Sequence, residues 1–125
     1  ATNPVRRFGK RFEEELPRLQ ELGLAQYHAW AFATTRQLGA AAELLSMHAQ
    51  WLADAGSRPE LAPAAASFLQ VSALCKTFIL KAARAVNSKK PFDARPLFDE
   101  MATAWESGMA VLDRAVATAS TGVPA

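Results

Sequence analysis

The sequence predicts an all-α fold, an antiparallel up-and-down bundle of about four helices with the first helix kinked near Pro17. Apolar residues recur at steps of three and four over long stretches, which is typical of amphipathic helices. No alternating run of β-branched residues is long enough to form a sheet. Start and stop signals divide the 125 residues into four helical segments joined by short connections, as in a bundle. A chain of this length is expected to form a single domain, residues 1–125.

The first helix begins at Asn3 and Pro4. Asn is a good N-cap, and proline is tolerated at the first helical position, where its missing N–H has no helical partner. Pro17 lies in the helix interior and predicts a kink or a break near residues 13–16. Gly23 can adopt the left-handed conformation that ends a helix, so this segment is expected to end near Leu22.

The other three helices follow from similar signals. The second is predicted from about Leu24 to Ala55, before Gly56. A turn at residues 57–60 precedes the third, which runs to about Asn87, and a loop over residues 87–96 contains Asp93 as a capping residue. The fourth helix is expected from about Arg95 to Thr118, followed by a frayed tail.

The third and fourth helices each carry an apolar seam that predicts the core. The third presents Leu61, Phe68, Val71, Cys75, Phe78, Ile79, Ala82 and Val86, and the fourth presents Phe98, Met101, Trp105, Met109, Leu112 and Val116.

Charge and cysteine content favour a cytoplasmic protein. The single cysteine cannot form an intramolecular disulfide. The longest uncharged run, residues 61–75, is too short and too polar to cross a bilayer, so no membrane partner is expected.

The net charge is only +2, but residues 57–95 carry seven basic and two acidic side chains. The chain is therefore expected to have one basic end, unlike a general nucleic-acid binder.

The second helix combines two apolar flanks with a polar strip. At about 100° per residue, one flank includes Trp30, Ala33, Leu44 and Trp51, and both apolar flanks are predicted to be buried. The strip holds His28, Phe32, Arg36, Gly39, Glu43, Ser46 and Gln50.

This strip has two interpretations. In the first, it faces solvent or pairs with charges of the first helix. In the second, it turns inward, and His28, Arg36 and Glu43 join Lys76 in a small-ligand or catalytic pocket between the second and third helices.

Other chemistry is not indicated by the sequence. His28 and His48 lie on nearly opposite faces and outside any Glu-x-x-His motif, so no metal site is predicted. Cys75 lies on an apolar helix side without a neighbouring histidine, as core cysteines do. The chain has no phosphate-binding loop, paired catalytic carboxylates or dinucleotide fingerprint. We therefore predict no catalytic residue, no cofactor and no enzymatic activity for this chain alone.

The basic end is a candidate docking surface for an acidic partner. Its residues are Lys81, Arg84, Lys89, Lys90 and Arg95, at the end of the third helix and in the following loop. A solvated surface explains the same cluster, and nucleic acid is not expected because the adjoining aromatics, Phe78 and Phe92, have core roles.

Self-association is a further expectation. Three Trp, seven Phe and a second helix with two apolar flanks exceed what one small core requires. The leading hypothesis is therefore a non-catalytic helical interaction domain that docks a partner or forms a homodimer.

Four stretches resemble the C-terminal helical region of a bacterial protein family of unknown function. They are "NPVRRF", "YHAWAFATTRQLGAAAELL", "LKAARAV" and "PFD" with "LFDEMATAWESGM". The resemblance implies longer proteins with a preceding α/β region, encoded near amino acid:carrier-protein ligases. Together with the missing initial Met, it leads us to expect that this chain is part of a longer protein. It also makes a carrier protein, typically acidic, a candidate partner for the basic end, while no functional residue can be transferred.

Overall fold

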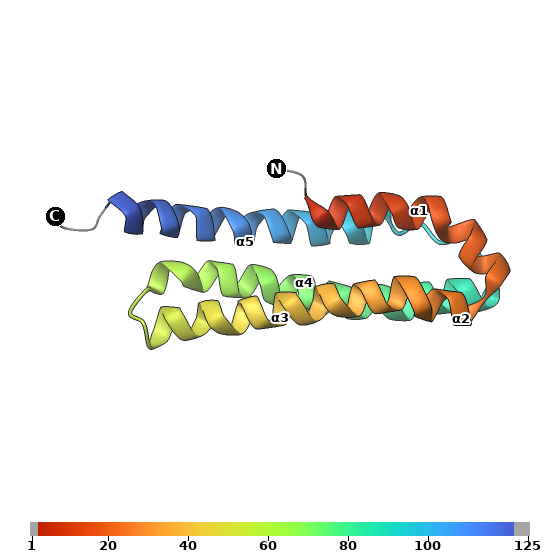
Figure 1. Ribbon diagram of the computed structural model, residues 1–125, viewed down its shortest axis with the longest axis horizontal. Coiled ribbons are helices and arrows are strands. Elements are labelled where there is room, and N and C mark those ends of the chain that lie inside the picture. Colours follow the sequence, from red (N-terminus) through yellow and green to blue (C-terminus); the bar gives the residue numbers. More distant parts are fainter. Residues whose placement is uncertain (1–2, 122–125) are drawn as a thin grey trace.

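The computed structural model describes residues 3–121, with side chains described up to Ala117. Within this range the chain is helical and has no strands, which confirms the predicted all-α class. Figure 1 shows α4 running back along α3, and α5 running back along α4. The elements are α1 (Pro4–Leu22), α2 (Leu24–Tyr27), the π-helical η1 (His28–Phe32), α3 (Ala33–Asp54), the 3₁₀-helical η2 (Pro59–Leu61), α4 (Ala62–Ser88) and α5 (Arg95–Thr121).

The ends of α1 follow the sequence signals. Asn3 Oδ1 accepts hydrogen bonds from the backbone N–H groups of Val5 and Arg6, at 2.9 and 3.4 Å. Gly23 has a φ of 89° and ends the helix. The helix continues through Pro17 without a break, and its last turns bend toward α2 (Figure 1).

The second predicted helix contains a π-helical turn that the sequence analysis missed. Residues 24–54 are helical throughout, but His28–Phe32 forms η1. Thr35, buried just after this turn, donates a hydrogen bond from Oγ1 to the Ala31 carbonyl at 2.7 Å. A π-turn inserts one extra residue, which rotates the preceding faces by roughly 100° relative to those that follow. The regular spacing assumed across this segment was therefore wrong.

The helix α4 is the centre of the bundle, packing against α3 and against α5. Its predicted seam is confirmed as core, with all of it buried except Ile79, which is half-buried. The rings of Phe12 and Phe98 both pack against Phe78, with centroids 4.8 and 4.9 Å from it, and against each other at 6.0 Å. Such close, inclined aromatic pairs stabilise the core beyond their buried area.

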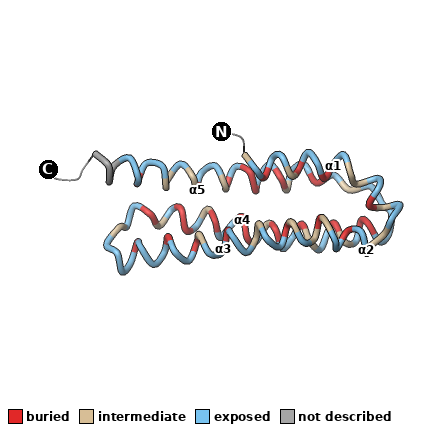
Figure 2. The backbone as a smooth tube through the Cα atoms, viewed as in Figure 1, coloured by how far each residue is buried: buried red, intermediate tan, exposed pale blue. Residues whose placement is uncertain are grey.

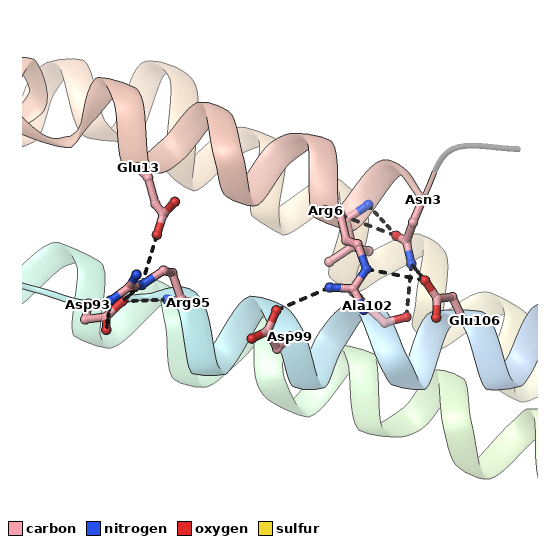
Figure 3. Close-up of polar contacts among 9 residues, drawn as sticks. Asn3, Arg6, Glu13, Asp93, Arg95, Asp99, Ala102 and Glu106 are labelled. Atoms are coloured by element: carbon pink, nitrogen blue, oxygen red, sulfur yellow. Dashed lines mark hydrogen bonds and ion pairs between the residues drawn. The ribbon is translucent and has the colours of Figure 1, made fainter.

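The helix α1 covers only half the length of this bundle (Figure 1). Its beginning is fixed by the Asn3 amide, which donates to the Ala102 carbonyl and to Glu106 Oε1, both at 3.0 Å. Arg6 also pairs with Asp99 and Glu106 (Figure 3). Within residues 3–121, the part of the bundle beyond this level, which we call the distal half, therefore has three helices where the other half has four.

The core thins out in the distal half. Along the predicted seam of α5, Phe98 and Met101 are buried, whereas Val116 is 68% exposed. The expectation that Val116 belongs to the core was wrong, because α1 does not reach its level. A separate small cluster of Ala53, Leu61 and Ala115 remains there.

Candidate functional site: an apolar stripe on α3

Large apolar side chains face solvent along the distal part of α3. Leu44, Met47 and Trp51 are 56%, 61% and 64% exposed. Figure 2 shows buried positions of this helix interspersed with a long series of exposed ones. Single exposed apolar residues are ordinary, but a contiguous group of them on one face marks an interaction surface.

These three residues belong to a longer pattern with heptad spacing. The outer stripe, as we name it, consists of exposed positions separated by alternating steps of four and three: Ala33, Gln37, Ala40, Leu44, Met47 and Trp51. It lies opposite the buried face of α3, which includes Ala42, Ala49 and Ala53. Apolar residues at an average spacing of 3.5 are the pattern by which one helix packs along another.

Part of this stripe was predicted to lie in the interior. The flank containing Trp30, Ala33, Leu44 and Trp51 was expected to be buried, but Trp30 is half-buried and the other three are exposed. The prediction was wrong because α3 packs chiefly against α4, while α5 lies against another side of α4. Only one face of α3 is covered. Met47 and Ala40 were not predicted as members of this surface, although the alternating steps of four and three residues could be read from the sequence.

Charged side chains border the outer stripe on one side. The Arg36 guanidinium lies 5.8 Å from the centre of the Phe32 ring. Asp54 accepts hydrogen bonds from the Gln50 amide at 3.0 and 3.1 Å. Glu43 lies between them along the helix, and all of these charges are exposed. They form a polar border of the kind that surrounds an apolar contact patch.

Three of the four residues of the predicted polar cluster meet at one groove. Arg36, Glu43 and Lys76 line a groove of about 370 Å³ between α3 and α4. Thr35 and Cys75, both buried, also line this groove. His28, the first residue of the π-helical turn, does not line this groove. The three charged side chains are exposed and form no ion pair with one another in the described structure.

Cys75 is buried and packed against a methionine. Its side chain is 1% exposed, and its sulfur lies 3.9 Å from the Met101 sulfur. Burial raises the pKa of the Cys75 thiol from 9.0 to about 12. Because the thiolate is the reactive form, this burial disfavours reaction at the Cys75 sulfur.

The predicted basic end divides into two kinds of residue. Lys81, Arg84, Lys89 and Lys90 are exposed and form no ion pair with a described residue. Arg95 is occupied, because it pairs with Asp93 at 2.9 Å and with Glu13 at 3.5 Å (Figure 3). Its hydrogen bonds lower the pKa of Asp93 and raise that of Arg95.

Two other features concern metals and membranes. Among residues 3–121, no three or more His, Cys, Asp or Glu side chains are grouped as a metal site. The helical stretch Pro59–Ser88 is long and apolar enough to cross a membrane by length and composition alone, a test that a core helix also passes. In this fold the stretch is the central helix, packed against both α3 and α5.

Comparison with known proteins identifies the family. The family model of the DUF1839 C-terminal domain matches residues 1–114. No curated protein and no solved structure matches the chain significantly. Since the match covers nearly the whole sequence, this chain belongs to the DUF1839 C-terminal domain family, whose function is unknown.

Proposed function

We propose that this chain is a non-catalytic helical interaction domain that self-associates through the outer stripe of α3. One observation carries the proposal: Leu44, Met47 and Trp51, each more than half exposed, share one helix face at heptad spacing. Burying such side chains against another helix is the ordinary way to remove them from water.

The expected free energy of association favours a reversible dimer. Full burial of a large apolar side chain stabilises by about 1.5–3 kcal/mol, so burying the exposed parts of six such side chains, three from each copy, gives roughly 5–10 kcal/mol. The loss of translational and rotational freedom costs about 4–15 kcal/mol. Because these two terms are similar, we expect a dimer that dissociates on dilution.

Charge substitution on the stripe tests this proposal. Leu44→Glu introduces a carboxylate at the centre of the stripe, and Val116→Glu is the matched control, since it alters an exposed apolar residue on α5. By size-exclusion chromatography with light scattering, we expect Leu44→Glu to weaken the dimer at least tenfold and Val116→Glu to leave it unchanged. Equal behaviour of the two variants would contradict the assignment of the interface to α3.

Docking of an acidic protein is the second candidate function, and it involves a different surface. Lys81, Arg84, Lys89 and Lys90 are exposed cations near the C-terminal end of α4, where positive charge is favoured and can steer an acidic partner. An acidic carrier protein is the candidate that the family resemblance suggests. Titration calorimetry at low salt tests it: Lys89→Glu with Lys90→Glu should weaken binding, whereas Arg95→Gln, at a cation already paired, should change it little. Unchanged binding by the double variant would count against docking here.

The pocket alternative has less support. Arg36, Glu43 and Lys76 do line one groove, but their side chains are exposed and His28 lies elsewhere. A ligand site usually surrounds its ligand and fixes a few polar groups around it.

A further inference from the structure

Resting on the proposed self-association, we infer that two copies of the chain pair their α3 helices antiparallel across the outer stripe. The twofold axis passes between Leu44 and Met47. Leu44 then lies opposite the partner's Met47, and Trp51 lies opposite the partner's Ala40. The occupant of this surface is thus a second copy of the same surface, as a twofold interface requires.

Side-chain size favours the antiparallel direction. The large residues of the outer stripe gather at one end, Leu44 to Trp51, and the small ones at the other, Ala33 and Ala40. A parallel pair would place Trp51 against the partner's Trp51 and leave the alanine end with little contact. The antiparallel pair sets the bulky indole over the alanine, so that the helices can approach along their whole contact.

Charge favours the same direction and fixes the register. Eighteen residues, or about five turns at 3.6 residues per turn, separate Arg36 from Asp54, so both lie on the same side of α3. An antiparallel twofold brings this side of one helix against the same side of the other. Arg36 then meets the partner's Asp54, and the pair forms twice. In a parallel pair, Arg36 would lie at the level of the partner's Arg36 instead.

The size of the surface agrees with a reversible pair. From Ala33 to Trp51 the stripe is about 27 Å long at 1.5 Å per residue, and a helix is roughly 10 Å wide. A strip of that size buries only a few hundred Å² on each copy. The total therefore falls below about 1,200 Å², the range of weak and transient complexes.

Two single-cysteine variants separate the two directions. His48 and Ala55 are both exposed and lie seven residues apart on one side of the outer stripe. In the antiparallel dimer the two copies of position 48 lie about 8 Å apart along the helix axes, and those of position 55 about 28 Å apart, at 1.5 Å per residue. In a parallel dimer both positions would lie at the level of their own copies, so neither would be favoured over the other. The natural Cys75 is buried, so the unmodified protein is the control.

The experiment treats His48→Cys and Ala55→Cys with a short bis-maleimide, and a sedimentation run on the same samples reports dimer formation. We expect covalent dimer from His48→Cys at five times or more the yield from Ala55→Cys, and none from the unmodified protein. Equal yields at both positions, or dimers that cross-link at neither, would overturn the antiparallel register while leaving self-association standing. Samples that sediment as monomers would instead overturn the proposed function itself.

Discussion

Gly9 of α1 lies directly against the ring of Phe98 on α5. A Cβ atom added to Gly9 would lie 2.7 Å from Phe98 Cγ, closer than real side chains allow. The Phe98 ring is itself surrounded by Phe8, Phe12 and Phe78. The absent side chain at position 9 is therefore what allows α1 to pack on the bundle.

The first prediction concerns this contact. Gly9→Ala should lower the free energy of unfolding by up to about 2 kcal/mol, because overpacking costs about 1–3 kcal/mol and the gain in helix propensity offsets about 1 kcal/mol of it. Gly39→Ala is the comparison, since its Cβ would meet Cys75 Cβ at 3.3 Å, a milder contact. Urea denaturation measures both. A Gly9→Ala protein as stable as Gly39→Ala would contradict the tight packing of α1.

Much of the fold follows from local sequence signals. The Asn3 cap, the Gly23 stop and the seam of α4 were predicted because capping and helical periodicity act within a few residues. The π-turn at His28–Phe32 was not predicted, because regular α-helical spacing was assumed from Leu24 to Ala55 and π-turns are rare. The exposure of Val116 was also missed, since it depends on where α1 begins along the bundle.

The second prediction is a loss of stability at alkaline pH. Burial raises the pKa of Tyr27 from 10.0 to about 12, and its hydroxyl donates to the Ile79 carbonyl at 2.8 Å. The Cys75 pKa rises from 9.0 to about 12. A raised folded-state pKa gives stability that is fully present below the unfolded pKa and is lost as pH rises toward the folded one. In thermal melts, the midpoint temperature should fall as the pH rises from 9 to 12. In Cys75→Ala this fall, measured from the variant's own midpoint at pH 7, should be smaller. A flat profile would contradict the burial of both groups.

The third prediction concerns acid and the beginning of α1. The Asn3 amide, and then Arg6, lower the pKa of Glu106. A lowered folded-state pKa gives stability that is present above the unfolded pKa and is lost as pH falls through the folded one. Amide exchange of the first turns of α1 should accelerate in acid relative to the rest of the bundle, and Glu106→Gln should remove most of that difference. Identical pH profiles in the two proteins would show that Glu106 does not hold this end.

The fourth prediction uses charge exchange across the dimer. Arg36→Glu alone and Asp54→Arg alone should each weaken self-association several-fold, because like charges then meet at both ends of the interface. Mixing the two variants should restore pairing, since every contact in the mixed dimer joins opposite charges. The two residues are about 27 Å apart within one chain, so rescue cannot arise within a chain. Sedimentation of the mixture measures this restored pairing. If the mixed variants stay monomeric while the unmodified protein dimerises, this register is excluded.

The candidate site was only partly predictable. The grouping of Arg36, Glu43 and Lys76 at one groove followed from helical spacing on neighbouring antiparallel helices. The outer stripe did not, because Leu44 and Trp51 look like core residues in sequence, and only the arrangement of α3, α4 and α5 decides which apolar face is covered. His28 was assigned to the polar cluster because the π-turn at residues 28–32, which changes the helical spacing, was not predicted.

The central claim is that the outer stripe of α3 is covered by a second copy of the chain. Sedimentation equilibrium of the unmodified protein over a wide micromolar concentration range tests it most directly. We predict a mass that rises from the 13.5 kDa of one chain toward twice that value, and that stays near one chain in Leu44→Glu. A single-chain mass at every concentration of the unmodified protein would contradict the claim.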